Sequence, residues 1–289
     1  MTVECACLCL KSGNVVILRG GREAFHSNRA LVSVFHKVLK TYRQSESLVN
    51  FVPTTDRAAV DFLLKRENDI HLVIPRGGEA LIRKVVRTSR IPVIKHYQGI
   101  CHVYVDEQAD LEKALAIAFN AKMQRPGVCN AMETLLVHEK TALRFLPRLG
   151  EKLREAGCEV RGDSKTRKYL SWAKPAKPTD YGHEFLDKIL AVKVVPSLDA
   201  AIEHIQIFGS AHTDAIVTEN SESAKKFTER VDSSSVMVNA STRFSDGFQY
   251  GFGAEIGIST DKIHARGPMG LKGLTSYKYI VEGNGHVRT

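Results

Sequence analysis

The chain reads LEKALAIAFNAKMQRPGVCNAMETLLV over residues 111–137, a helix pattern, a short loop and a strand pattern in succession. Apolar residues recur at helical spacing as far as Phe119, and Pro126 disfavours helical geometry in the residue before it. The apolar run at 134–137 predicts a strand. Cys129 is therefore expected on a short connection between a helix and a strand.

Cys129 is a candidate nucleophile. Lys122 and Arg125 come shortly before it, and a thiol near fixed cations loses its proton more readily, which gives the nucleophilic thiolate. An inert buried cysteine is the alternative that residue type alone favours. The other cysteines have no zinc or redox spacing, and we interpret them as reduced core residues of a cytoplasmic protein: Cys5, Cys7, Cys9, Cys101 and Cys158.

Strand and helix patterns alternate on both sides of this stretch. Strands are predicted at 14–18, 48–52, 70–75, 91–94 and 215–218, and helices at 28–39, 56–65, 79–87 and 142–157. Alternation of this kind with short turns predicts right-handed βαβ units and a parallel sheet.

The composition favours a globular protein with a small anionic ligand. Of 289 residues, 43% are hydrophobic and 25% charged, and no apolar run is long enough to cross a bilayer. The first residues contain Glu4 and no basic leader, so we expect no secretory signal. Lys and Arg exceed Asp and Glu by 41 to 32, a net charge of +9, but the basic residues are scattered and aromatic residues make up only 7%. Scattered charge of this kind favours a small phosphorylated molecule over nucleic acid.

Three glycine-rich segments contain arginine. Arg19-Gly20-Gly21 and Arg76-Gly77-Gly78 each follow a predicted strand, and ligands of open α/β sheets bind beyond the carboxyl ends of strands. Neither segment is a dinucleotide or Walker signature, and ordinary turns explain them equally well. The third segment, 238–271, combines lone arginines with many glycines, and we predict that it contacts the ligand.

Taken together, these motifs resemble the gamma-glutamyl phosphate reductase family of the aldehyde dehydrogenase superfamily. The resemblance runs in order along almost the whole chain. Its segments are LKSGN at 10–14, VILRGG at 16–21, IPRGG at 74–78, GICHVYVD at 99–106, QRP at 124–126, CN at 129–130, ETLL at 133–136, VNASTRF at 238–244 and HARGPMGL at 264–271.

The resemblance implies an α/β, aldehyde dehydrogenase-like fold. Residues 1–122 would form a Rossmann-like NADP-binding domain, 123–256 an α/β catalytic domain with the nucleophilic cysteine, and 257–289 a return segment to the cofactor and oligomerisation region. The family has a further N-terminal segment with an Arg-Pro-Asn motif, whose asparagine donates to the developing oxyanion. The resemblance therefore implies an N-terminally incomplete cofactor domain and an incomplete oligomerisation element.

The resemblance also implies a reaction, namely the NADPH-dependent reduction of L-glutamyl 5-phosphate to L-glutamate 5-semialdehyde and phosphate in L-proline biosynthesis. The enzyme would be a cytoplasmic homo-oligomer without a metal, a nucleic-acid partner or a membrane partner. A truncated remnant that retains only nucleotide binding or subunit association is the alternative.

Several residues match the family's functional positions. Cys129 is similar to the family nucleophile, and Glu184 to the superfamily glutamate that contacts the nicotinamide-side ribose. The other candidate cofactor-binding residues are Arg19, Gly20, Gly21, Arg76, Gly77 and Gly78. The candidate substrate-binding residues are Arg125, Asn130, Arg243 and Arg266, although each arginine could equally be a structural ion-pair partner.

The stretch at 92–99 contains no carboxylate. Hydrolytic members of the superfamily use a glutamate there to activate water. A reductase that releases phosphate has no need of that base, because water would destroy its thioester.

Overall fold

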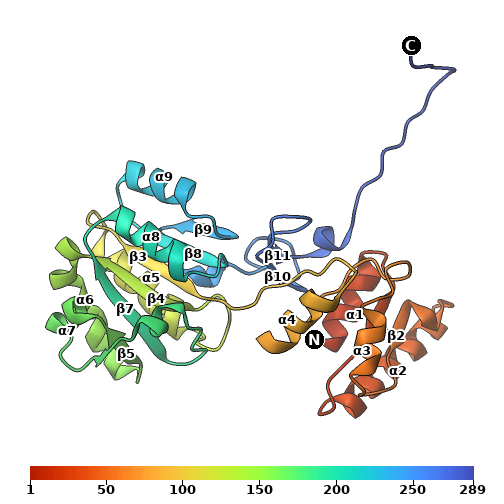
Figure 1. Ribbon diagram of the computed structural model, residues 1–289, viewed down its shortest axis with the longest axis horizontal. Helices are drawn as coiled ribbons and strands as arrows, with labels where there is room; N and C mark the ends of the chain where they lie inside the picture. The colour runs from red at the N-terminus through yellow and green to blue at the C-terminus, as the bar shows by residue number, and fades with distance from the viewer.

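A seven-stranded parallel sheet forms the larger lobe of the computed structural model, which describes residues 1–289 (Figure 1). The strand order is β6-β5-β7-β4-β3-β8-β9, and all neighbouring strands are parallel. The strands are β3 (Cys101–Val105), β4 (Met132–His138), β5 (Glu159–Gly162), β6 (Lys174–Pro175), β7 (Ile189–Val195), β8 (Thr213–Val217) and β9 (Ser235–Val238). The predicted parallel α/β sheet is confirmed.

Helices cover both faces of this sheet. They are α5 (Leu111–Met123), α6 (Glu139–Glu155), α7 (Ser164–Tyr169), α8 (Leu198–Phe208) and α9 (Ser221–Arg230). Along β4, Leu135 and Val137 pack in the core beneath α5 and α6, whereas Leu136 packs in the core beneath α8 and α9. Every residue of β3 and β4 is buried, as expected for parallel strands covered on two sides.

The smaller lobe contains a two-stranded parallel sheet with helices around it. Its elements are α1 (Thr2–Lys11), β1 (Val16–Leu18), α2 (Phe25–Thr41), η1 (Glu46–Leu48), β2 (Val49–Phe51), α3 (Ala58–Leu63) and α4 (Glu79–Thr88). The strands predicted at 70–75 and 91–94 are reduced to one bridge between Val73 and Val93. Pro75 and Pro92 lack the N–H groups that a longer ladder would need.

The last part of the chain returns to the smaller lobe. β10 (Gly257–Ser259) and β11 (Gly267–Met269) form an antiparallel pair, followed by η4 (Leu271–Leu274). Ile256 and Met269 pack with Leu8 of α1 and with Ile94. Residues beyond η4 extend away from the body of the molecule (Figure 1).

Two further predictions differ from the structure. The sheet begins at Cys101, so β3 and α5 belong to the larger lobe, and the domain boundary predicted after residue 122 is misplaced. The reason is that β3 lies between β4 and β8 and pairs with both. The N-terminal cysteines lie on helix α1, and Cys7 is exposed, so they are not all core residues; all six cysteines are free thiols.

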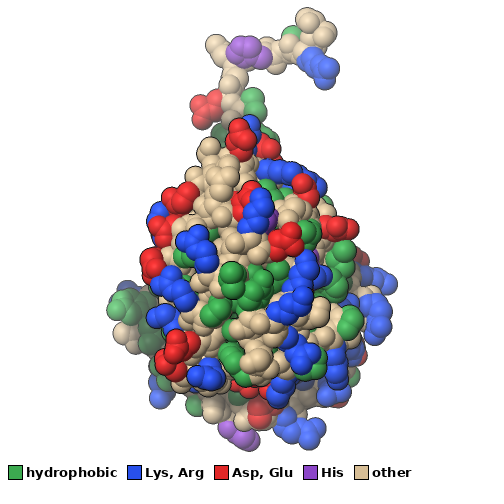
Figure 2. Space-filling model, turned by 90° about the vertical axis from the view of Figure 1, so that its left-hand side faces the viewer, with side chains coloured by type: hydrophobic (Ala, Val, Ile, Leu, Met, Phe, Trp, Pro, Cys, Tyr) green, Lys and Arg blue, Asp and Glu red, His purple; other side chains and the backbone are tan.

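The surface of the larger lobe has no segregated charge on the face shown in Figure 2. Lysine and arginine side chains lie among acidic and apolar ones there. No helix of the protein combines the length and the apolar composition required to cross a membrane.

Candidate active site around Cys129

Cys129 lies on the loop between α5 and β4, as predicted. α5 ends at Met123, two residues before the Arg125-Pro126 pair, and β4 begins at Met132. The loop packs tightly against the segment before β3. A Cβ atom on Gly99 would stand 1.9 Å from the carbonyl oxygen of Cys129, so only glycine allows this approach.

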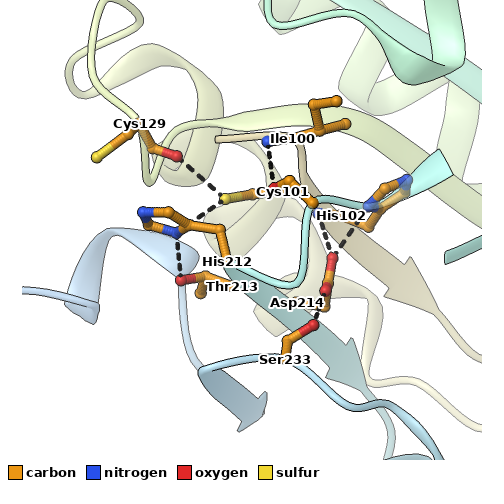
Figure 3. A network of polar contacts seen from close by, with 9 residues as sticks. Ile100, Cys101, His102, Cys129, His212, Thr213, Asp214 and Ser233 are labelled. Atoms are coloured by element: carbon orange, nitrogen blue, oxygen red, sulfur yellow. Dashed lines mark hydrogen bonds and ion pairs between the residues drawn. The ribbon is translucent and has the colours of Figure 1, made fainter. Parts of the chain in front are cut away.

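Two further contacts fix the backbone of the loop. The buried Cys101 thiol donates to the Cys129 carbonyl oxygen at 3.2 Å, and the same sulfur lies 3.7 Å from Nδ1 of His212. Asn130 donates through Nδ2 to the carbonyl oxygen of Ser245 at 2.8 Å. The Cys129 side chain points away from the Cys101 network, so its sulfur takes no part in that network (Figure 3).

The Cys129 thiol is protonated at rest. Burial, followed by the negative charges of Glu255 and Glu184, raises its pKa to about 11, against the opposing effects of a backbone hydrogen bond and of the Arg76 charge. The predicted activation by Lys122 and Arg125 is wrong. Lys122 is fully buried in an ion pair with Glu133, and Arg125 is exposed.

Two carboxylates lie close to the thiol. Oε1 of Glu184 accepts the Gly99 N–H at 2.8 Å, and Oε2 of Glu255 accepts the Gly247 N–H at 3.0 Å. Burial raises the pKa of both carboxyl groups, and these backbone hydrogen bonds oppose the shift. Sequence reasoning missed Glu255, whose only signal was a lone acid in the glycine-rich run 251–257.

The predicted arginines lie in different surroundings. Nε of Arg243 donates to Oε1 of Gln124 at 2.8 Å. Burial lowers the pKa of Arg243; the negative charge of the Cys129 thiolate opposes this shift and the Arg125 charge adds to it, so Arg243 lies near both the thiol and Arg125. Arg266 instead pairs with Asp232, with Nη2 2.7 Å from Oδ1.

The first glycine turn borders a polar hollow. This cavity has a volume of about 780 Å³ and no hydrophobic residue in its lining, which consists of Arg19, Gly21, Arg22, Glu23, Thr54, Thr55, Asp56 and Arg57. Nη2 of Arg19 donates to the Thr55 carbonyl oxygen at 2.8 Å, whereas its buried Nε has no partner. Gly20 packs against Asn28, since a Cβ there would stand 2.1 Å from the amide nitrogen.

The second glycine turn, Arg76-Gly77-Gly78, leads into helix α4, with Gly78 as its N-cap residue. The Arg76 guanidinium lies against Gly257, where a Cβ would stand 3.2 Å from Nη1. Its charge lowers the pKa of both Cys129 and Glu255. The structure therefore brings Arg76, from the smaller lobe, close to the thiol.

His96 stands in the carboxylate-free stretch at 92–99. Its Nδ1 lies 3.2 Å from the carbonyl oxygen of Ile258, and burial lowers the pKa of the ring. The side chain is therefore neutral near pH 7. The structure contains no group of three or more His, Cys, Asp or Glu side chains placed to hold a metal ion.

Comparisons with known proteins agree on one family. The model of the aldehyde dehydrogenase family matches residues 1–167. Proteins named gamma-glutamyl phosphate reductase from Carboxydothermus hydrogenoformans and Desulfatibacillum aliphaticivorans are 56% and 58% identical to the chain over 288 and 289 residues. Each alignment covers 100% of this chain and 69% of the relative.

Solved structures give the same result. The gamma-glutamyl phosphate reductase of Thermotoga maritima is 51% identical and superimposes with a TM-score of 0.97, covering 100% of this chain and 70% of its own. An engineered glycolyl-CoA reductase with bound NADP⁺ superimposes with a TM-score of 0.69 at 17% identity, over 93% of this chain and 68% of its own. The second likeness concerns the fold alone.

Proposed function

The chain belongs to the gamma-glutamyl phosphate reductases of the aldehyde dehydrogenase family, and from that membership we propose that it reduces L-glutamyl 5-phosphate to L-glutamate 5-semialdehyde, a step of L-proline biosynthesis. The observation that carries the proposal is the half-buried Cys129 thiol with Arg243 beside it. A nucleophile next to a guanidinium suits an acyl phosphate, because that substrate is both an electrophile and an anion.

Cys129 would form the covalent intermediate. Its thiolate attacks the acyl carbon, a C–S bond forms, and the bond from that carbon to the phosphate oxygen breaks, so that phosphate leaves and a thioester remains. The thiol must first lose its proton. Glu255 is our candidate acceptor, because among the charges that raise the thiol pKa its effect is the largest.

The chain's residues fit a nicotinamide dinucleotide. When bound, this cofactor supplies the hydride that reduces the thioester. Glu184 would bind the ribose on the nicotinamide side, beside Cys129. Collapse of the resulting thiohemiacetal then releases the aldehyde and restores the Cys129 thiol.

We propose NADPH as the preferred form of the cofactor. The hollow beside β1 contains Arg19, Arg22 and Arg57, and guanidinium groups suit the 2′-phosphate that distinguishes NADPH from NADH. The buried, unpartnered Nε of Arg19 is a free donor in that position. Gly21 lines the hollow, whereas Gly20 would contribute through its packing against Asn28. The N-terminus of α4 after Gly77 and Gly78 would suit the pyrophosphate of the cofactor.

The substrate's anionic groups would bind Arg243, which lies near the Cys129 thiol, and Arg125, whose charge acts on Arg243. Asn130 would mainly fix the loop that carries Cys129, since its Nδ2 already donates to the carbonyl oxygen of Ser245. Arg266 would have to leave Asp232 to reach a substrate, and we place it last among the candidates. No carboxylate at 92–99 could activate a water molecule to attack the thioester; the neutral His96 lies in this stretch.

The chain would act as a homo-oligomer in a reducing compartment, the cytoplasm. Tyr277, Tyr279, Ile280 and Val281 are each at least 75% exposed in the extended tail, and apolar side chains in such a segment suit contact with a second copy. The six free thiols support the compartment. Native mass spectrometry of the chain, with and without residues 276–289, tests the assembly.

A direct assay tests the reaction. The chain should oxidise NADPH only when glutamyl phosphate is present, and release one phosphate for each NADPH consumed. The Cys129→Ala variant should have no activity, whereas Cys7→Ala, at an exposed thiol on α1, serves as the matched control. Activity of the Cys129→Ala variant equal to that of the parent would refute the mechanism. Nucleotide binding without turnover by the parent would favour the alternative of a remnant.

A further inference from the structure

A fully buried ion pair lies beneath the candidate site. Nζ of Lys122, in the last turn of α5, stands 2.7 Å from Oε2 of Glu133 on β4, and neither side chain is exposed. Burying two charges costs several kcal/mol for each ion before their attraction is counted. An apolar pair would fill the same space without this desolvation free energy. We therefore expect the charged pair to have a role other than stabilising the fold.

The hydrogen bond made by the second carboxylate oxygen of Glu133 indicates that role. Oε1 accepts the backbone N–H of Leu186 at 3.2 Å. Leu186 has a φ of 55°, in the left-handed region that few residues other than glycine adopt. The carbonyl oxygen of Leu186 also lies against the loop that carries Cys129: a Cβ on Gly127 would stand 3.5 Å from this oxygen. Glu133 therefore holds a strained backbone turn beside Cys129.

That turn contains Glu184. Two residues before Leu186, the Glu184 carboxylate accepts the Gly99 N–H, and Gly99 packs against the Cys129 carbonyl. The contacts close a ring: Lys122 to Glu133, Glu133 to Leu186, then along the chain to Glu184, Gly99, Cys129 and back to the end of α5. Within this ring, Glu133 is the link that reaches both α5 and the Glu184 turn.

We propose that Glu133, fixed by Lys122, is a positioning residue that sets the Glu184 turn for the nicotinamide ribose through the Leu186 N–H. The role of Glu184 on which this inference rests belongs to the proposed function. What Glu133 must supply is an oxygen that accepts the Leu186 N–H, and its negative charge is not required. Burial raises the pKa of Glu133 to about 7 and Lys122 opposes the shift, so the carboxyl group can take up a proton and still accept from Leu186.

Two double variants separate the acceptor from the charge. Lys122→Met/Glu133→Gln removes both charges and keeps an acceptor oxygen, whereas Lys122→Met/Glu133→Met removes both charges and the acceptor. We expect the glutamine variant to bind NADPH like the parent, and the methionine variant to bind about fivefold more weakly, the effect of one lost hydrogen bond. Titration of nucleotide fluorescence measures both. Equal affinities in two folded variants would overturn the proposal.

A cycle with Glu184 shows whether the effect passes through that residue. In a Glu184→Ala background, exchanging glutamine for methionine at position 133 should change the NADPH affinity less than twofold. An undiminished fivefold change there would mean that Glu133 acts by another route and would overturn the positioning role.

The parent chain supplies a test that needs no variant. The Leu186 amide should exchange with deuterium at least tenfold more slowly than an unbonded amide, because Glu133 accepts it. Exchange at the unprotected rate would overturn the proposal even if the methionine variant failed to fold. Neither nucleotide affinity nor amide exchange requires turnover, so failure of the parent to reduce glutamyl phosphate would refute the proposed function alone.

Discussion

Replacing Glu255 with glutamine should lower the pKa of the Cys129 thiol. Burial raises that pKa to about 11, and Glu255 is the largest of the charges that add to the shift, ahead of Glu184. Glutamine keeps nearly the same shape and removes the charge, so the effect of burial remains while the repulsion disappears. We expect the titration midpoint of the thiol to fall by about one pH unit, as is usual for removal of one neighbouring charge.

The rate of alkylation reports this shift. Near pH 8, a thiol with a pKa of about 11 is ionised to only ~0.1%. A drop of about one unit raises the thiolate about tenfold, but a less basic thiolate is a weaker nucleophile by about threefold, so labelling should be about threefold faster. Iodoacetamide labelling over a range of pH, with the Cys129 peptide quantified by mass spectrometry, gives both the midpoint and the rate.

Glu219→Gln is the matched control. The exposed Glu219 carboxylate pairs with Lys113 near the start of α5, and the rest of this helix, as far as Met123, separates Lys113 from the loop that carries Cys129 by about 15 Å. The control should leave the Cys129 midpoint unchanged. An unchanged midpoint in Glu255→Gln, or an equal change in both variants, would refute the assignment of Glu255 to the thiol.

Three further predictions follow from other parts of the structure. Arg22→Ala should raise the KM for NADPH about tenfold and leave that for NADH unchanged, because the arginine borders the hollow that suits a 2′-phosphate; equal increases would contradict the phosphate site. Gly99→Ala should lower reductase activity at least about a hundredfold and stability by about 1–3 kcal/mol, because the new Cβ displaces the Cys129 carbonyl; steady-state kinetics and urea unfolding measure both, and a fully active variant would show that the loop adapts. Burial lowers the pKa of His204 to about 3, so the folded state keeps the ring neutral while the unfolded chain takes up a proton below about pH 6.5. That contribution to stability is complete above about pH 6.5 and is lost as the pH falls, by about 1.4 kcal/mol per unit. His204→Phe should remove this slope in urea unfolding between about pH 4 and 6.5, and identical slopes for variant and parent would contradict the assignment.

Local sequence signals located many of the regular elements. Apolar periodicity and Pro126 placed the end of α5, and the run at 134–137 placed β4, because each pattern reflects contacts within a few residues. The pairing of β3 with β4 and β8 joins residues far apart in the chain, and no local pattern carries that information. The first domain boundary was misplaced for this reason.

The candidate site shows the same limit. Lys122 is near Cys129 in sequence, but the helix turns its side chain into the core, toward Glu133 on the neighbouring strand. Arg266 pairs with Asp232, which is 34 residues away. Closeness to Cys129 in the sequence therefore predicted the wrong cations as neighbours of its thiol. The cations that act on the thiol are Arg76 and Arg243, which only the fold brings near it.

The return of the chain's end to helix α1 sets an order of assembly during synthesis. Asn14 donates to the carbonyl oxygen of Leu274 at 2.7 Å, across 260 positions, and Leu8 packs against Met269. The larger lobe is continuous from β3 to β9, so it can fold while the ribosome is still translating the rest. The smaller lobe, although its helices precede the larger lobe in the sequence, cannot close before residues 256–274 are made, since contacts distant in sequence form late.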